Sequence, residues 1–208
     1  MGRDANATGY VMAGGGSTRF GRDKALVEFD GKPMLARILQ LLQGVTDNVK
    51  LVAPPGKYAA FGVEIIADRW PGEGPLGGIV TALLDAEACQ PRCDWNLMVS
   101  CDMPFLTRDW LLFLRDRAAR SNAQVVLANS VQGPEPLCAC WRTDAAGTLR
   151  AAFESGVRKV MEGLQHVRTE VLDEADWKRF DSAGRLFWNM NTAADFEEVR
   201  RAWEAERR

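Results

Sequence analysis

Short apolar runs alternate along this chain with segments whose apolar residues recur every three or four positions. The strand-like runs of the first two thirds are 8–12 (TGYVM), 49–53 (VKLVA), 63–68 (VEIIAD), 95–100 (WNLMVS) and 124–129 (QVVLAN). Helical patterns lie between them at 33–44, 78–88 and 108–119. A short apolar run bounded by turn residues is typical of a buried strand, and a period near 3.6 is typical of an amphipathic helix. The alternation predicts an α/β fold with a Rossmann-like, mostly parallel sheet and helices on both faces.

The same alternation continues to the end of the chain. EPLCACW at 135–141 has strand character, HVRTEVL at 166–172 follows a helical pattern at 156–164, and LFWNMN at 186–191 leads into a last helix over 192–203. Thr107 is placed to cap the helix at 108–119, and Gly44 to end the first helix. No linker, repeat or low-complexity tract interrupts the pattern, so we expect one domain over residues 1–208. The ligand crevice of such a sheet lies beyond the carboxyl ends of its strands.

The composition narrows the class of partner. A formal net charge of −2 over 208 residues gives no basic field for nucleic acid or an anionic membrane surface. No apolar run approaches the roughly 20 residues of a membrane helix, and the first residues lack the apolar stretch of a secretory signal. We therefore expect a cytoplasmic protein. The five cysteines form no paired C-x-x-C motif and are expected to be free and mostly buried, and the single histidine, His166, is expected to be structural.

A glycine-rich, basic loop, AGGGSTRFGRDK, begins at Ala13. Its three consecutive glycines let main-chain N–H groups close around phosphate oxygens, and Arg19 and Lys24 add fixed positive charge. A Walker loop would need Lys and Ser or Thr where Arg22 and Asp23 stand, and a dinucleotide loop would need glycine at Arg19. The loop therefore predicts a triphosphate site of a third kind.

Asp102 follows a strand-like run directly and precedes Pro104, which is where α/β crevices collect ligands. Its hard carboxylate suits Mg²⁺, which commonly takes one or two carboxylates and completes its shell with phosphates and water. Alternatively, Asp102 caps the turn that follows it. On either interpretation, the sequence puts one carboxylate at the expected crevice.

Two further segments carry polar or glycine residues after strand-like runs. Asp68 ends one such run and is followed by GPLGG, with Gly77 and Gly78 at the start of a helix; the alternative is that Asp68 only ends its strand in a turn. FWNMNT puts Asn189 and Asn191 on one side of an expected strand, so that both amides face one ligand. The alternative there is that Asn191 caps the last helix.

The loop resembles that of the nucleotidyltransferase superfamily, L-A-G-G-x-x-x-R-M-G-x-x-K. The form RFGRDKAL, followed by GKPML, GPLGG, CDMP and FWNMNT in that order, is similar to the molybdenum cofactor guanylyltransferases. This resemblance implies a sheet of the nucleotide-diphospho-sugar-transferase type. It also implies transfer of GMP from GTP to the terminal phosphate of Mo-molybdopterin, with release of pyrophosphate. Molybdoenzyme apoproteins or their chaperones would then receive the product.

The resemblance also assigns roles to individual residues. It implies a nucleotide site at Met12, Ala13, Gly14, Gly15, Lys24, Asp68 and Asp102, catalytic roles for Arg19, Lys24 and Asp102, Mg²⁺ on Asp102, and an acceptor site at Gly77, Gly78, Asn189 and Asn191. Val52 and Ala53 stand where the family often has a nucleotide-contacting Asn. Three alternatives therefore stay open: CTP as donor to the same pterin, another nucleotide with a sugar-phosphate acceptor, and a non-catalytic protein that binds GTP or the pterin.

Overall fold

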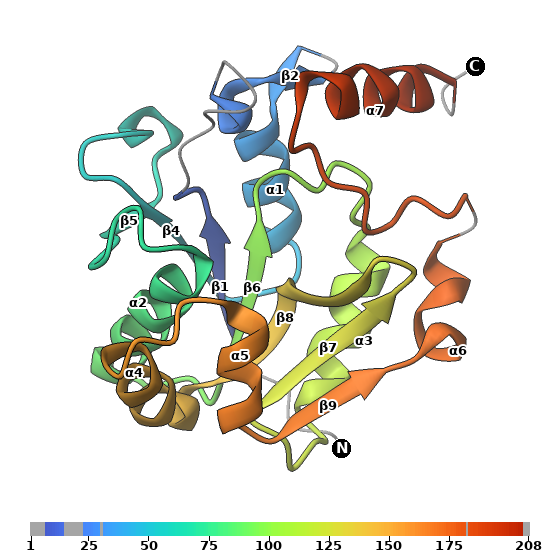
Figure 1. Cartoon of the computed structure of the whole chain (residues 1–208). Helices are drawn as coiled ribbons and strands as arrows, with labels where there is room; N and C mark the ends of the chain where they lie inside the picture. Colours follow the sequence, from blue (N-terminus) through green and yellow to red (C-terminus); the bar gives the residue numbers. More distant parts are fainter. Residues whose placement is uncertain (1–6, 15–22, 30, 182, 206–208) are drawn as a thin grey trace.

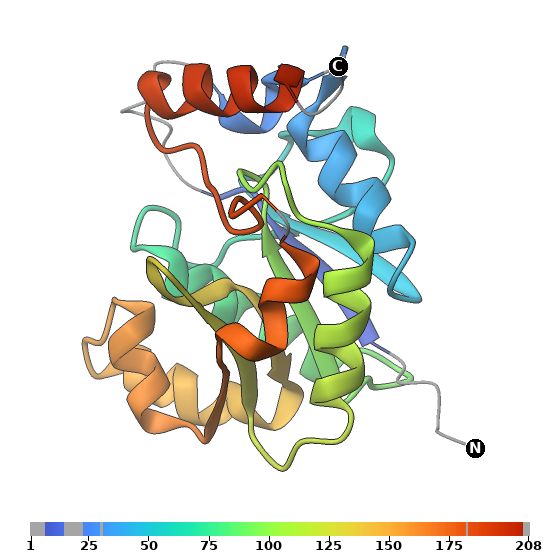
Figure 2. The same ribbon diagram turned by 90° about the vertical axis from the view of Figure 1, so that its right-hand side faces the viewer.

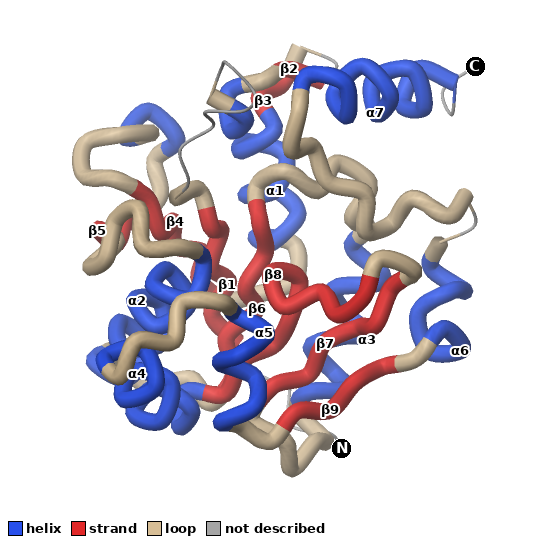
Figure 3. The backbone as a smooth tube through the Cα atoms, in the orientation of Figure 1, coloured by secondary structure: helices blue, strands red, loops and turns tan. Residues whose placement is uncertain are grey.

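A computed structural model of the chain describes residues 7–14, 23–29, 31–181 and 183–205. Its centre is a seven-stranded sheet of order β5-β4-β1-β6-β8-β7-β9 (Figures 1 and 3). The strands, in that order, are β5 (Glu64–Ala67), β4 (Asn48–Ala53), β1 (Ala7–Met12), β6 (Trp95–Ser100), β8 (Gly133–Arg142), β7 (Val125–Ser130) and β9 (Thr169–Leu172). β8 runs antiparallel to both neighbours, and the other pairs are parallel. The predicted mostly parallel sheet is confirmed.

Helices cover both faces of the sheet, as predicted (Figures 1 and 2). One face packs against α1 (Met34–Gln43) and α3 (Arg108–Ala118), and also holds Trp177 of α6 (Glu174–Trp177). The last helix, α7 (Ala193–Ala205), lies beyond the carboxyl edge of the sheet, where Phe196 and Trp203 pack against Phe29 (Figure 1). The other face packs against α2 (Pro75–Ala88), α4 (Ala146–Glu154) and α5 (Val160–Gly163). Neighbouring residues of β1 divide between the layers, with Val11 in the first core and Tyr10 and Met12 in the second, because successive strand side chains point to opposite faces. Within the described residues, no helix is long and apolar enough to cross a membrane.

Local signals placed most element ends correctly. Thr107 caps α3, since its hydroxyl accepts a hydrogen bond from Trp110 N at 3.3 Å, and Gly44 follows the end of α1. α2 begins three residues earlier than the helical pattern, at Pro75, after Gly74 with φ of 94°. That positive φ favours glycine, and proline suits the first turn of a helix because its missing N–H would have no intrahelical partner there.

Three expected elements differ from the structure. Residues 186–191 form no strand: Phe187 packs edge-on against Trp110, and Trp188 against Phe105, so their apolar side chains complete the core beside α3. The strand expected over 166–172 begins only at Thr169, and His166 lies exposed in a 3₁₀ turn (Leu164–His166). The helix expected over 156–164 is a single turn, Val160–Gly163, while α4 and the β2 (Glu28–Phe29) and β3 (Lys32–Pro33) hairpin were not predicted.

Three neighbouring strands end at one level. Met12 is in register with Val52 of β4 and with Ser100 of β6. The ladder continues one step beyond, because Ala13 N donates to Val52 O at 3.0 Å and Cys101 N donates to Met12 O at 3.3 Å. The segments after β1, β4 and β6 therefore emerge side by side. The C-terminal segment before α7 passes over the same edge (Figure 2).

Candidate active site

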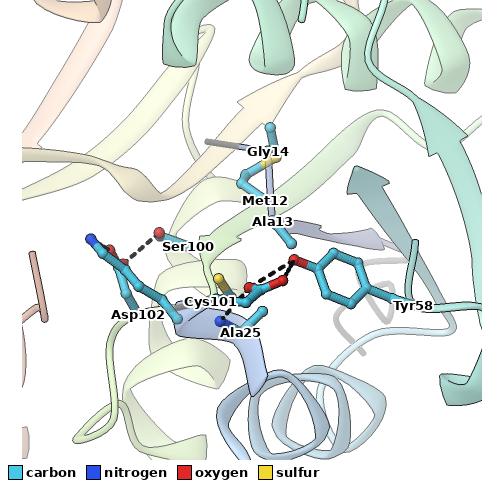
Figure 4. Close-up of a pocket in the computed structure, with 10 residues that line it drawn as sticks. Met12, Ala13, Gly14, Ala25, Tyr58, Ser100, Cys101 and Asp102 are labelled. Atoms are coloured by element: carbon cyan, nitrogen blue, oxygen red, sulfur yellow. Dashed lines mark hydrogen bonds and ion pairs between the residues drawn. The ribbon is translucent and has the colours of Figure 1, made fainter. Parts of the chain in front are cut away.

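A pocket of about 120 Å³ lies at this carboxyl edge of the sheet (Figure 4). The end of β1, the 3₁₀ helix Lys24–Leu26, the segment after β4 and the end of β6 contribute its walls. Its lining residues are Met12, Ala13, Gly14, Asp23, Lys24, Ala25, Tyr58, Ser100, Cys101 and Asp102. Five of the residues predicted from the sequence therefore line one cavity: Met12, Ala13, Gly14, Lys24 and Asp102.

Lys24 connects three distant parts of the chain. Its Nζ lies 3.5 Å from Asp102 Oδ2 and donates a hydrogen bond of 2.9 Å to Asn191 Oδ1. The side chains of Lys24 and Asp102 are only 17% and 16% exposed, so solvent screens this ion pair weakly. Lys24, the predicted phosphate-binding cation, thus contacts both the predicted metal-binding carboxylate of Asp102 and the predicted acceptor-binding amide of Asn191.

Asp102 is held from both sides. Ser100 Oγ donates to Asp102 Oδ1 at 2.6 Å, and the main-chain O of Asp102 accepts from Met190 N at 3.1 Å. Its carboxylate accepts no main-chain hydrogen bond within the described part of the chain, which disfavours the alternative of a turn cap. Figure 4 shows Asp102 and Ser100 on one side of the pocket and Tyr58 on the other.

Asn189 and Asn191 lie together although no strand carries them. Asn191 Nδ2 donates to Asn189 Oδ1 at 2.8 Å. The side chain of Asn191 does not cap α7: Thr192 Oγ1 accepts from Asp195 N at 3.1 Å, and the Asp195 carboxylate accepts from the main-chain N of both Asn191 and Thr192 at 2.8 Å. This capping box fixes the turn that directs the Asn191 amide towards Lys24.

Asp68 lies opposite the start of the glycine loop. Its Oδ1 accepts hydrogen bonds from Trp70 N at 3.0 Å and Thr81 Oγ1 at 3.3 Å, so the turn interpretation is correct for one of its oxygens. Its Oδ2 lies 3.5 Å from the place that a Cβ would take at Gly14. A side chain at residue 14 would therefore contact this carboxylate oxygen, which glycine leaves uncovered.

Gly77 and Gly78 lie buried in the first turn of α2. A Cβ at Gly78 would lie 2.8 Å from Met12 Cε, and one at Gly77 would lie 3.3 Å from Trp70 Cβ. Close packing of α2 explains both glycines without a ligand. Their role in acceptor binding stays a prediction.

Sequence reasoning missed five of the ten lining residues, among them the polar residues Ser100, Asp23 and Tyr58. Ser100 precedes Asp102 by two positions at the end of β6, and this spacing is a signal that was there to find. Asp23 accepts a hydrogen bond from Ala25 N at 3.1 Å as the N-cap of the 3₁₀ helix that carries Lys24, a position this residue type favours. Tyr58 is 35 residues from Asp23 in the sequence, and no local pattern predicts their contact.

Among the described lining residues, one ammonium group, Lys24, lies with two carboxylates, Asp23 and Asp102, so a polyanion bound here would need a counter-ion of its own. Within the described part of the chain, no group of three or more His, Cys, Asp or Glu side chains could hold a metal ion, so Asp102 is not part of a cage. Burial raises the pKa of the Cys101 thiol well above its ordinary value, so this pocket residue is neutral. All five cysteines are free, and three are buried, as predicted. Gly15 and Arg19 lie outside the described residues.

The order of motifs and the sheet agree with the comparison to known families. Residues 9–169 match the model of the MobA-like NTP transferase domain, more than half of the chain. The chain belongs to the MobA-like NTP transferases. This membership confirms the family that the sequence motifs resemble.

Individual MobA-like relatives match over nearly the whole chain. A protein of Deinococcus radiodurans named probable molybdenum cofactor guanylyltransferase is 32% identical, over 92% of this chain and 93% of its own length. The molybdenum cofactor guanylyltransferase of Nitrobacter hamburgensis is 31% identical, over 93% of this chain and 92% of its own. The crystal structure of molybdopterin-guanine dinucleotide biosynthesis protein A from Archaeoglobus fulgidus has a TM-score of 0.82 at 24% identity, over 95% and 99% of the two chains. The fold and the family are thereby established.

Proposed function

We propose that this chain is a molybdenum cofactor guanylyltransferase, which transfers GMP from GTP to the terminal phosphate of Mo-molybdopterin and releases pyrophosphate. The single observation that carries the proposal is the meeting of Lys24, Asp102 and Asn191 at one point. A cation for phosphates, a carboxylate for a metal ion and an amide from the C-terminal segment are what the reaction needs between donor and acceptor. The names of the relatives supply the chemical identity of both substrates.

The guanine base is assigned to a position beside Gly14 and Asp68, where both residues can contact its edge. The Ala13 N–H and the Met12 carbonyl already take part in the sheet ladder, which leaves the Gly14 amide as the first main-chain donor beyond the strand. Asp68 Oδ2 faces this glycine, and the two lone pairs of this oxygen can accept hydrogen bonds from the N1–H and N2–H of guanine. Adenine lacks this pair of donors, so Asp68 is the residue that selects the base.

The triphosphate is assigned to Lys24 and, outside the described residues, to Gly15 and Arg19. Mg²⁺ fits Asp102: one carboxylate oxygen is fixed by Ser100, and the other already faces a cation, Lys24. A single carboxylate suffices because Mg²⁺ takes its other ligands from phosphates and water. When bound, Mg²⁺ supplies positive charge to the phosphates during transfer.

Lys24 has to leave Asp102 before this carboxylate can hold a second cation. Its ammonium lies 3.5 Å from Asp102 Oδ2, where it would repel a divalent ion. GTP provides a new partner for Lys24, since its phosphates attract the ammonium group more strongly than one shared carboxylate does. Donor binding and metal binding are therefore coupled through Lys24.

The acceptor is assigned to the side of Lys24 on which Asn191 lies. The paired amides of Asn189 and Asn191 lie there, and Met190 ties their segment to Asp102 through a hydrogen bond of 3.1 Å. We place the terminal phosphate of the pterin at these amides, in line with the α-phosphate of GTP, and Gly77 and Gly78 nearer its other end. Transfer is expected to take place in the cytoplasm, with molybdoenzyme apoproteins or their chaperones as receivers of the product.

Pyrophosphate release tests this proposal directly. The protein is incubated with Mo-molybdopterin, Mg²⁺ and each of GTP, CTP, ATP and UTP in turn. We expect release with GTP that requires the pterin, together with formation of the guanine dinucleotide. Release with CTP alone would refute the guanylyl assignment, and binding of GTP without turnover would identify a non-catalytic protein. Asp102→Ala is the matched control, because it removes the metal ligand and should leave only background release.

A further inference from the structure

Tyr58 has a backbone conformation that its side chain disfavours. With φ of 65° it is the one non-glycine residue with positive φ among residues 7–14, 23–29, 31–181 and 183–205. Such strain persists only where the surroundings hold a residue in place, and it concentrates at functional sites. The contacts of the Tyr58 side chain are therefore expected to matter.

The hydrogen bonds of the Tyr58 hydroxyl converge on Asp23. The Tyr58 hydroxyl lies 2.9 Å from each Asp23 carboxylate oxygen, and Lys57 Nζ lies 2.7 Å from Asp23 Oδ2. Asp23 in turn accepts from Ala25 N and begins the 3₁₀ helix whose first residue is Lys24. Figure 4 shows the Tyr58 ring reaching into the pocket from the side opposite Asp102.

The protonation states keep this network fixed. Burial, together with the hydrogen bond to Asp23, raises the pKa of Tyr58 to about 12, so its hydroxyl remains a donor. Burial acts to raise the pKa of Asp23, but the hydrogen bonds from Lys57 and Tyr58 outweigh it and hold that pKa below its ordinary value. Near neutral pH the network contains a carboxylate with two strong donors.

We infer that Tyr58 and Asp23 form a clamp that positions Lys24 for the donor triphosphate, an inference that rests on the proposed function. Tyr58 stands in the segment after β4, whose last residues, Val52 and Ala53, occupy the place where the family often has an Asn. In this chain that segment thus acts on the nucleotide through Lys24. Tyr58 is a positioning residue. Its hydroxyl contacts Asp23, and the phosphates are contacted by the ammonium group of Lys24, the residue that follows Asp23.

A double-mutant cycle tests the clamp. Tyr58→Phe, Lys24→Met and the double variant are compared for binding of inorganic tripolyphosphate without metal, and for turnover of GTP. We expect Tyr58→Phe to weaken tripolyphosphate binding roughly fivefold to tenfold, and to add almost nothing to the loss caused by Lys24→Met, because coupled residues are non-additive. Tripolyphosphate carries the charge of the donor without its base, so this result does not depend on guanine recognition.

Tyr10→Phe is the matched control. Tyr10 donates a hydrogen bond of 2.7 Å to Asp85 inside the α2 layer, and neither residue lines the pocket. Tyr10→Phe should change the thermal midpoint of unfolding in the same way as Tyr58→Phe. It should leave the affinity for tripolyphosphate unchanged. Wild-type affinity in Tyr58→Phe, or losses that add fully in the double variant, would overturn the clamp. A wild-type protein that binds tripolyphosphate but transfers no GMP would refute the proposed function and leave the clamp to be judged by the binding cycle.

Discussion

Replacing Lys24 by Met should change metal binding and turnover in opposite directions. At 3.5 Å, with an effective dielectric constant of about 20, the attraction between Lys24 and Asp102 is about 5 kcal/mol before other terms are counted. When a divalent cation binds Asp102 in the absence of nucleotide, part of the attraction between Lys24 and Asp102 is lost. The loss is only partial because Lys24 can keep its hydrogen bond of 2.9 Å to Asn191. We expect a net cost of about 1 to 2 kcal/mol, which is roughly a fivefold to thirtyfold weaker affinity for a divalent ion.

Titration with Mn²⁺ alone, followed by the paramagnetic resonance signal of the free ion, measures this affinity without any reaction. Lys24→Met should bind Mn²⁺ more tightly than the wild type by the factor above. The same variant should lower kcat/KM for GTP by about 100- to 1000-fold, because the phosphates lose a preorganised positive charge. Lys32→Met is the control: it removes the same charge from an exposed residue that does not line the pocket. Unchanged or weaker Mn²⁺ binding in Lys24→Met, or equal tightening in the control, would refute the reasoning.

Three further predictions concern single carboxylates. Asp102→Asn should keep the thermal midpoint within a few degrees and lower kcat by roughly 100-fold or more, since it loses the charged metal ligand; turnover near the wild-type rate would exclude Asp102 as that ligand. Asp68→Ala should lower the preference for GTP over ATP by roughly 10- to 100-fold in competition assays, because hydrogen bonds to a charged acceptor contribute about 1.5–3 kcal/mol; unchanged preference would move base selection elsewhere. The pKa of Asp23 is lowered on folding, so its stabilisation is present above pH about 4 and is lost as the pH falls through the lower folded-state value. The difference in unfolding free energy between wild type and Asp23→Asn should therefore be largest near neutral pH and shrink in acid; a constant difference would contradict the assigned shift.

The elements that build the nucleotide side were predictable because each carries its own signal. β1, β4 and β6 are short apolar runs that end in turns, and parallel strands bring their carboxyl ends together. The position of Asp102 and Lys24 at this edge could be predicted from this pattern and from the loop. The direction of β8 was not predictable, since an alternating strand reads the same whichever way its neighbours run.

Contacts between distant residues were also beyond the sequence. Tyr58 and Asp23 are 35 positions apart, and their hydrogen bonds leave no periodic trace. The apolar residues Phe187 and Trp188 satisfy a strand pattern as well as they satisfy packing against Trp110 and Phe105. Tertiary packing decided between the two, which is why Asn189 and Asn191 meet through a turn and not along a strand.

The order of the site along the chain separates its two specificities. Every strand of the sheet ends by Leu172, and the residues assigned to the nucleotide lie before Pro104. The amides assigned to the terminal phosphate of the acceptor, Asn189 and Asn191, come from a later segment that crosses the sheet edge, and of the acceptor residues only Gly77 and Gly78 lie among the strands. Exchange of residues 183–192 between relatives that keep Asn191, and with it the hydrogen bond to Lys24, would therefore alter the acceptor without rebuilding the donor side. A fold divided in this way can acquire a new acceptor by changing one short stretch of chain, while the machinery that activates the nucleotide is inherited intact.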